Sequence, residues 1–212
     1  MQNKQIIEPK RSIDVIHETD VLVVGSGPGG LSAASASARC GVQTTLLERF
    51  GCFGGNITVV GVEGFAWYRH EKTVEAGGIG REFEELAKEM GAAVPESQSL
   101  SYELDSEGFK LVADKLVMDS GIHPMLHRSF SMPIMEGNTI IGVIVESKAG
   151  REAILSKVVI DATGDADVAF RAGAQLNTMP VEELMATSVM FHLAGVDKKA
   201  FLSEIQNNPQ SY

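Results

Sequence analysis

The hydrophobic and polar positions near the start of the chain follow the pattern of a strand, a helix and a second strand. Residues 19–24 form a short β-branched run, which is typical of a strand buried in a parallel sheet. The Ala- and Ser-rich stretch 28–40 predicts a helix that packs closely on that sheet, and Gly41 ends it. A second apolar run at 42–48 predicts the next strand. Together these segments predict a βαβ unit.

The rest of the chain first shows helical spacing and then the spacing of strands. After the glycine-rich stretch 51–77, which predicts a loop, helices are predicted at 79–90 and 109–119. From residue 122 onward, turn residues separate five predicted strands, at 123–126, 130–135, 139–147, 152–155 and 157–161. A helix ending at Ala172 follows the last of them.

These patterns predict an α/β fold with a doubly wound, Rossmann-like sheet, a β-meander and a small helical insertion at about 56–107. We expect an N-terminal extension at 1–18, a nucleotide-binding domain at 19–200 and a short C-terminal segment at 201–212.

The composition narrows the function classes. The 212 residues are 44% hydrophobic and 22% charged, which is ordinary for a globular protein. A net charge of -10 without a Lys or Arg cluster argues against a nucleic-acid partner. No apolar stretch approaches the ~20 residues of a membrane span, and the polar N-terminus has no signal-peptide core, so we expect a cytoplasmic protein with no membrane partner. The two cysteines, Cys40 and Cys52, suit no four-cysteine metal site, and we expect no metal.

The segment from Asp20 to Gly30, DVLVVGSGPGG, has the glycine spacing of a dinucleotide-binding turn between a strand and a helix. In such a turn Gly25 permits the sharp change of direction, Gly27 lets the backbone approach a pyrophosphate, and Gly30 lets the helix pack on the sheet. The helix N-terminus offers free N–H groups and a positive dipole end to the phosphates.

An acidic residue at the end of the second strand strengthens this interpretation. Glu48 follows the turn at close to the ~20 residues expected of a carboxylate that binds the adenosine ribose. A surface glutamate without a role is the less favoured interpretation. The fingerprint by itself does not choose between a nicotinamide and a flavin dinucleotide.

Two later motifs bear on that choice. The pair Gly54-Gly55 is a second place where backbone can approach a cofactor, and a plain turn is an equally good interpretation of it. The sequence Ala-Thr-Gly-Asp at 162–165 follows a buried strand and returns the chain to the same sheet edge. Asp167 is expected to serve the helix N-terminus, whereas the local residues leave the role of Asp165 open.

These motifs together resemble the FAD-dependent oxidoreductases of the glutathione-reductase-like type, in particular the subgroup that includes the flavoproteins of heterodisulfide reductase and fumarate reductase. The resemblance extends from residue 19 to about 200. It rests on the segments DVLVVGSGPGGLSAA, LLERFGCFGGNIT, GGIGREF, GNTIIGVIVESKAGREAI, KVVIDATGDADVAFRAGA and MATSVMFHLAGVD.

The resemblance implies an FAD cofactor and assigns residues to it by position. The residues so implied are Gly25, Ser26, Gly27, Pro28, Gly29 and Gly30 at the pyrophosphate, Glu48 and Arg49 at the adenosine ribose, Gly54, Gly55 and Asn56 toward the flavin, the backbone of Phe130 at the adenine edge, and Thr163, Gly164 and Asp165 along the cofactor.

The resemblance implies an oxidoreductase that transfers a hydride or electrons between a small-molecule substrate and FAD. Because the resembled proteins are longer, we expect this chain to be the N-terminal part of such a protein. One alternative is a non-catalytic dinucleotide-binding fragment that needs a partner or a missing half, and another is an NAD(P)-dependent reductase. A homo-oligomer or a partner electron-transfer protein is also among the expectations.

No catalytic residue is assigned from the sequence. Asn-Ile-Thr-Val-Val follows the glycine pair where disulfide reductases carry their CxxxxC dithiol, so dithiol chemistry is disfavoured, and Cys52 is expected to be a packing or loop residue. The five histidines show no ligand spacing. His70, in the insertion, is the one histidine considered as a candidate near a substrate.

Overall fold

A computed structural model describes residues 5–65, 69–70, 73–74, 77–96 and 101–211. The chain divides into two compact units, Met1–Met179 and Pro180–Tyr212.

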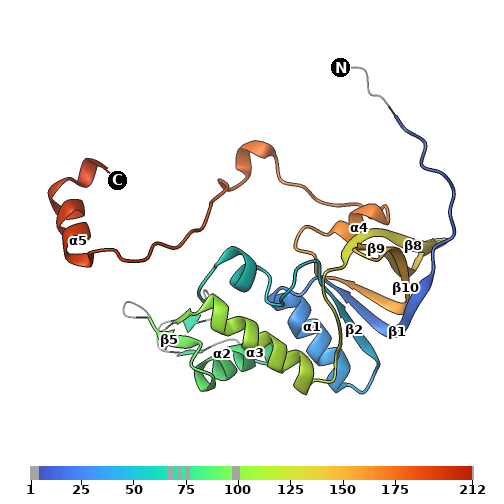
Figure 1. Ribbon diagram of the computed structural model, residues 1–212, viewed down its shortest axis with the longest axis horizontal. Helices are drawn as coiled ribbons and strands as arrows, with labels where there is room; N and C mark the ends of the chain where they lie inside the picture. The colour runs from blue at the N-terminus through green and yellow to red at the C-terminus, as the bar shows by residue number, and fades with distance from the viewer. Residues whose placement is uncertain (1–4, 66–68, 71–72, 75–76, 97–100, 212) are drawn as a thin grey trace. The chain divides into compact units, whose positions relative to one another are not determined.

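The first unit is built on a six-stranded sheet with the strand order β7-β2-β1-β10-β9-β8 (Figure 1). Its strands are β1 (Val15–Val24), β2 (Thr44–Leu47), β7 (His123–Met125), β8 (Ser129–Glu136), β9 (Thr139–Ser147) and β10 (Gly150–Asp161). Strands β7, β2, β1 and β10 pair in parallel, whereas β8, β9 and β10 form an antiparallel meander. The sheet thus confirms the Rossmann-like α/β class.

Strand β10 corrects one detail of the sequence analysis, because the two strands predicted at 152–155 and 157–161 are a single strand. Its first half pairs antiparallel with β9, and residues 153–161 pair in parallel with β1. Ser156 is polar and interrupts the apolar pattern, so the sequence predicts a strand end there. In the structure Ser156 pairs with Thr19 of β1, and the strand continues through it. The meander and the parallel strands therefore belong to one continuous sheet.

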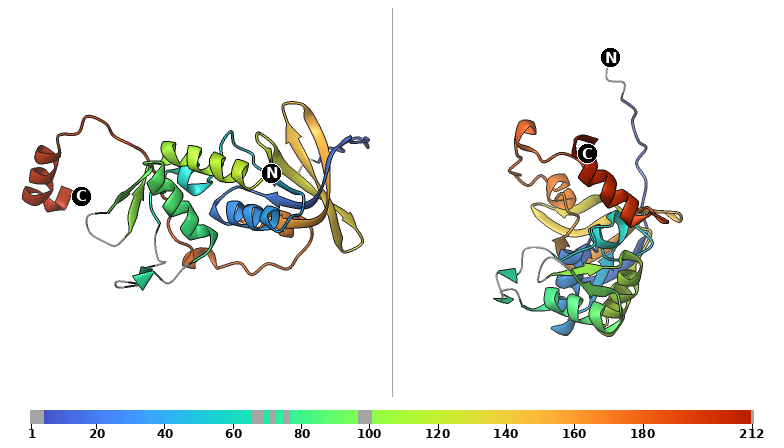
Figure 2. Two further views of the ribbon diagram at one scale, coloured as in Figure 1. Left: turned by 90° about the horizontal axis from the view of Figure 1, so that it is seen from below. Right: turned by 90° about the vertical axis from the view of Figure 1, so that its left-hand side faces the viewer.

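Three helices pack together on one face of this sheet: α1 (Pro28–Arg39), α2 (Ile79–Glu89) and α3 (Ser106–Asp119). In Figure 2 the blue α1 and the green α2 and α3 are grouped beside the strands. The core under them joins Leu31 of α1, Phe83 of α2 and Phe109 of α3 to Val23 and Leu46 of the sheet. Each helix thus buries apolar residues at helical spacing, and this burial packs the three helices onto the sheet.

Helix α3 begins earlier than the predicted residue 109. The side chain of Asp105 accepts a hydrogen bond from the backbone N of Glu107 at 3.0 Å, which is an N-cap. The hairpin of β5 (Ala93–Pro95) and β6 (Tyr102–Leu104) comes before α3 in the chain. A second short hairpin pairs β3 (Arg69–His70) with β4 (Thr73–Val74).

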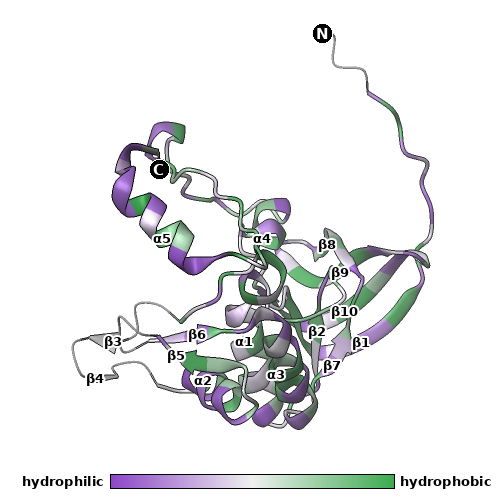
Figure 3. Cartoon of the chain, turned by 60° about the vertical axis from the view of Figure 1, so that its left-hand side comes forward, coloured by the Kyte–Doolittle hydropathy of each residue, from purple (hydrophilic) through white to green (hydrophobic). Residues whose placement is uncertain are grey.

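The opposite face of the sheet carries a second, smaller core. Leu22 and Val24 of β1 pack there with Val143 and Val145 of β9, under the meander and the short helix α4 (Asp167–Arg171). Figure 3 shows hydrophobic residues in green along the strands and hydrophilic residues in purple on the outer turns of α2 and α3. Strand β1, which the glycine turn follows, thus has a hydrophobic core on each of its faces.

The second unit consists of the 3-10 turn η2 (Val181–Glu183), helix α5 (Lys198–Asn207) and the 3-10 turn η3 (Pro209–Ser211). The Asp197 side chain caps α5 by accepting hydrogen bonds from the backbone N atoms of Lys199 and Ala200. The boundary expected at residue 200 falls within α5. Among the residues that the structure describes, no helix is long and apolar enough to cross a membrane.

Candidate cofactor-binding site

A cleft of about 970 Å³ opens at the carboxyl ends of the parallel strands. It is lined by the last residues of β1, β2 and β10, which are Val24, Leu47 and Asp161. Ligands of open α/β sheets bind at this edge, and the volume lies at the upper end of the roughly 300–1,000 Å³ of small-molecule sites. The cleft therefore has the position and the size for a large nucleotide.

The first glycine turn shows a separate physical reason for each of its three spaced glycines. Gly25 has φ +97° and a Cβ there would overlap the carbonyl of Ala162. A Cβ on Gly30 would collide with the carbonyl oxygen of Gly25, so this glycine allows the helix to approach the turn. A Cβ on Gly27 would meet nothing within 4 Å, because this position faces the open cleft. The space beside Gly27 fits a phosphate that approaches the backbone at the N-terminus of α1.

Glu48 lies at the start of the loop after β2, where its buried carboxylate reaches the glycine turn. Its Oε2 accepts hydrogen bonds from the backbone N of Ser26 at 2.9 Å and from the Ser26 Oγ at 2.6 Å. Its Oε1 accepts a hydrogen bond from the backbone N of Phe50 at 2.9 Å. The carboxylate lines the cleft and at the same time ties β2 to the turn after β1.

The second glycine loop packs directly on the first. Gly54 has φ +115° and its backbone N donates to the carbonyl of Ser26 at 2.9 Å. Gly55 has φ +54°, and a Cβ on it would come within 2.6 Å of the Cα of Gly27. A five-residue π-helix, η1 (Asn56–Val60), follows and contributes Asn56 to the cleft. Gly55 is thus part of the cleft wall, whereas Gly54 shapes the turn behind it.

Asp161, the last residue of β10, organises the Ala-Thr-Gly-Asp turn. Its Oδ1 accepts hydrogen bonds from the backbone N and the Oγ1 of Thr163, at 3.1 and 2.7 Å. Its Oδ2 accepts one from the backbone N of Ala169 at 2.9 Å. The Thr163 Oγ1 in turn accepts one from the backbone N of Asp167. This network holds Thr163 and Gly164 against the cleft.

The structure brings most of the residues expected at the cofactor to this one cleft. Those that line it are Gly25, Ser26, Gly27, Pro28, Gly29, Glu48, Arg49, Gly55, Asn56, Phe130, Thr163 and Gly164. Three expected residues are not among its lining residues: Gly30, which packs against the turn, Gly54, which faces Thr58, and the exposed Asp165.

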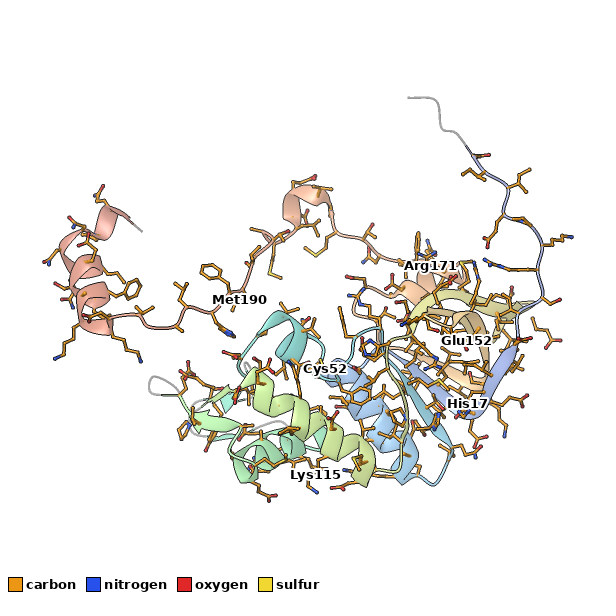
Figure 4. The ribbon with its side chains drawn as sticks, viewed as in Figure 1. His17, Cys52, Lys115, Glu152, Arg171 and Met190 are labelled. Carbon is orange, nitrogen blue, oxygen red and sulfur yellow. The ribbon has the colours of Figure 1, made fainter. Side chains whose placement is uncertain are left out.

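Several lining residues were not assigned from the sequence. Asp161 and Asp167 belong to a recognised motif, but only the turn geometry shows that they face the cleft. Arg128 and Arg171 come from a loop and from the end of α4, and no local pattern marks them. Figure 4 shows Arg171 at α4, where its guanidinium lies 3.7 Å from the sulfur of Met132.

The arginines give the cleft cationic side chains in a chain whose net charge is -10. Arg49 lies over the ring of Phe50, with 4.7 Å from its guanidinium carbon to the ring centroid. Arg128 donates to Glu152 at 3.4 Å. Glu48, Asp161 and Asp167 also line the cleft and balance these arginines, so the N-terminus of α1 is the part of the cleft that favours an anionic group such as a pyrophosphate.

The other residues singled out in the sequence lie apart from the cleft or outside the description. Cys52 is half-buried beside η1 (Figure 4), with its Sγ 3.9 Å from the Oγ1 of Thr58, and it is not a lining residue. The His70 side chain lies outside the described residues.

Comparison with known proteins identifies the family of the chain. The family model described as "FAD dependent oxidoreductase" matches residues 20–211. A thiamine thiazole synthase of Metallosphaera sedula is 32% identical over 160 residues, which cover 70% of this chain and 55% of that protein. One from Saccharolobus islandicus is 32% identical over 186 residues, covering 78% and 66%. The chain thus spans about half to two thirds of the length of these curated relatives.

A solved structure shows the same fold at lower identity. The structure of THI4 from Thermovibrio ammonificans superposes with a TM-score of 0.53 at 21% identity, covering 73% of this chain and 61% of that one. No support appears among these comparisons for the NAD(P)-dependent alternative. The glycine turn, the buried carboxylate of Glu48 beside it and the family match over residues 20–211 lead to one conclusion: the chain belongs to the family of FAD-dependent oxidoreductases, and its cofactor is FAD.

Proposed function

We propose that this chain forms the FAD-binding part of an oxidoreductase that transfers a hydride or electrons between a small molecule and FAD. The observation that carries the proposal is Gly27, which stands at the N-terminus of α1 with open space beside it in a cleft of about 970 Å³. In that position backbone N–H groups and the helix dipole bind a pyrophosphate.

Different residues of the cleft bind different parts of the cofactor. The turn around Gly27 and the facing Gly55 hold the pyrophosphate, Glu48 and Arg49 hold the adenosine ribose, and the backbone of Phe130 reads the adenine edge. Thr163, which is held by Asp161 and lines the cleft, would contact the bound cofactor. FAD supplies the redox chemistry when bound, whereas these residues bind it and orient it.

The test is to purify the chain with added FAD and to measure binding by the visible spectrum and by the change in flavin fluorescence. Saturable binding in the micromolar range supports the proposal, and a chain that retains no flavin contradicts it. Reduction of the bound flavin by candidate small molecules then separates a catalytic chain from a non-catalytic fragment. Calorimetric titration with NADH tests the nicotinamide alternative, which requires tight NADH binding without FAD binding.

A second candidate is a thiazole synthase activity of the kind that the relatives' name states. It is favoured by the 32% identity over 160 residues to the Metallosphaera sedula protein. The test is complementation: the chain is expressed in a bacterial strain that grows only when thiazole is supplied. Growth without thiazole supports this candidate. If the Metallosphaera sedula protein supports growth and this chain does not, the result counts against a thiazole synthase activity of this chain.

A further inference from the structure

Ser26 and Glu48, which both line the cleft, form a buried polar pair. The Ser26 side chain is fully buried, and Glu48 is only 6% exposed. The Ser26 Oγ donates to the Glu48 Oε2 at 2.6 Å, and the backbone N of Ser26 donates to the same oxygen at 2.9 Å. Hydrogen bonds to a charged acceptor in a buried site are stronger than those between neutral groups.

The opposite oxygen of the carboxylate is also engaged. Oε1 accepts the backbone N–H of Phe50 at 2.9 Å. A carboxylate offers about four acceptor positions, so three hydrogen bonds leave roughly one for a ligand. A ribose presents two neighbouring hydroxyls, and Glu48 in this arrangement has room to accept from one of them.

We propose that Ser26 is a positioning residue that holds the Glu48 carboxylate in place before any nucleotide binds and leaves it one acceptor position for a ribose hydroxyl. This inference rests on the proposed function, because it takes the ribose of FAD as the ligand of Glu48. Ser26 acts on the ribose through Glu48, because its hydroxyl donates to the Oε2 and its side chain is fully buried.

The matched variants are Ser26→Ala and Ser35→Ala. Ser35 is a fully buried serine of α1, and among the described residues its Oγ has no hydrogen-bond partner. Both variants remove one buried serine hydroxyl, but only the first removes a hydrogen bond to Glu48. Binding of FAD, ADP, 2′-deoxy-ADP and 3′-deoxy-ADP to the full chain is measured by calorimetric titration.

The wild-type chain is expected to bind one deoxy nucleotide about fivefold or more weakly than ADP and the other within about twofold, because only one hydroxyl has an acceptor on Glu48. Ser26→Ala is expected to weaken ADP binding and to bring the affinity ratio between ADP and the weaker deoxy nucleotide toward one. Ser35→Ala is expected to keep the wild-type ratio.

Two results would overturn the inference. Equal weakening of all three nucleotides by Ser26→Ala would show a merely structural role, because the ratio between them would not move. Equal loss for both deoxy nucleotides in the wild-type chain would show that Glu48 receives both ribose hydroxyls.

A measurement without ligand separates this inference from the proposed function. Urea unfolding of Ser26→Ala, Glu48→Gln and the double variant forms a double-mutant cycle. Both oxygens of Glu48 face a backbone N–H, so either orientation of the glutamine amide places an NH₂ group against a donor. Non-additive effects support the pair even if no nucleotide binds, in which case only the proposed function has failed. Additive effects contradict the pair itself.

Discussion

Gly27 and Gly55 lie against each other in the cleft, although they belong to different loops. A Cβ on Gly55 would come within 2.6 Å of the Cα of Gly27, whereas a Cβ on Gly27 would enter open space. The two glycines are therefore needed for different reasons: Gly55 for the packing of the loops and Gly27 for access to the ligand. Alanine substitutions separate the two roles.

Gly27→Ala is expected to fold normally and to lose FAD binding. Gly27 has φ -61° and ψ 178°, which an alanine adopts without strain, and the added methyl points into the cleft. We expect a thermal midpoint close to that of the wild-type chain and an FAD affinity lower by at least about tenfold, since the methyl occupies the path of the pyrophosphate. Circular dichroism melting and fluorescence titration measure the two quantities. An unchanged FAD affinity would show that the pyrophosphate does not bind at this turn.

Gly55→Ala is expected to destabilise the chain itself. The residue has φ 54° and ψ -120°, a conformation that side chains rarely adopt, and the methyl would meet the backbone of Gly27. Strain and overpacking together predict a loss of roughly 2–4 kcal/mol in the free energy of unfolding. Urea unfolding without ligand measures it. Gly80→Ala in α2 is the control, because a Cβ there meets nothing within 4 Å, and it should be neutral or stabilising.

Asp161→Asn is expected to loosen the turn that holds Thr163. Both carboxylate oxygens of Asp161 accept a backbone N–H, so the amide NH₂ of asparagine must face a donor at one of them. A hydrogen bond to a charged acceptor is worth about 1.5–3 kcal/mol, and for these part-buried bonds we expect a destabilisation toward the lower end of that range together with weaker FAD binding. Asp114→Asn, on the exposed side of α3, is the control and should change neither quantity. Wild-type behaviour of Asp161→Asn would show that the turn does not depend on this network.

The parts of the fold and site that the sequence predicted are those that depend on local geometry. The glycine turn and Glu48 follow from a strand, a turn and a helix in fixed spacing, and all of them lie where this spacing requires. The sequence pattern divides strand β10 in two because Ser156 is polar, and its pairing with Thr19 depends on a strand far away in the sequence.

The residues missed at the site depend on tertiary contacts. Arg171 reaches the cleft because α4 packs beside β8, and no spacing in the sequence contains that information. Asp165 was expected beside the cofactor from its place in the motif, but it is exposed and is not among the lining residues, whereas its neighbours Gly164 and Ala166 are. A motif predicts the turn, whereas the side chain that enters the cleft is set by the backbone angles within it.

The stacked pair His17 and His123 predicts a pH dependence of stability. The two ring centroids are 4.5 Å apart, and the His17 Nε2 lies 2.9 Å from the Thr45 Oγ1. Burial, followed by the charge of a protonated His123, lowers the pKa of His17 below its ordinary value of 6.5. Between this lowered pKa and pH about 6.5 the unfolded chain binds more protons than the folded one, so the free energy of unfolding rises with pH through this window.

Full stability from this site is therefore expected above pH about 6.5, and it is lost as the pH falls toward the lowered pKa of His17. Thermal midpoints measured between pH 5 and 8 should fall on the acid side for the wild-type chain and fall less for His17→Gln. The thermal midpoint of His123→Gln should also fall less, because removing the neighbouring charge brings the pKa of His17 back toward 6.5. Identical curves for the wild-type chain and His17→Gln would show that protonation of His17 is not coupled to folding.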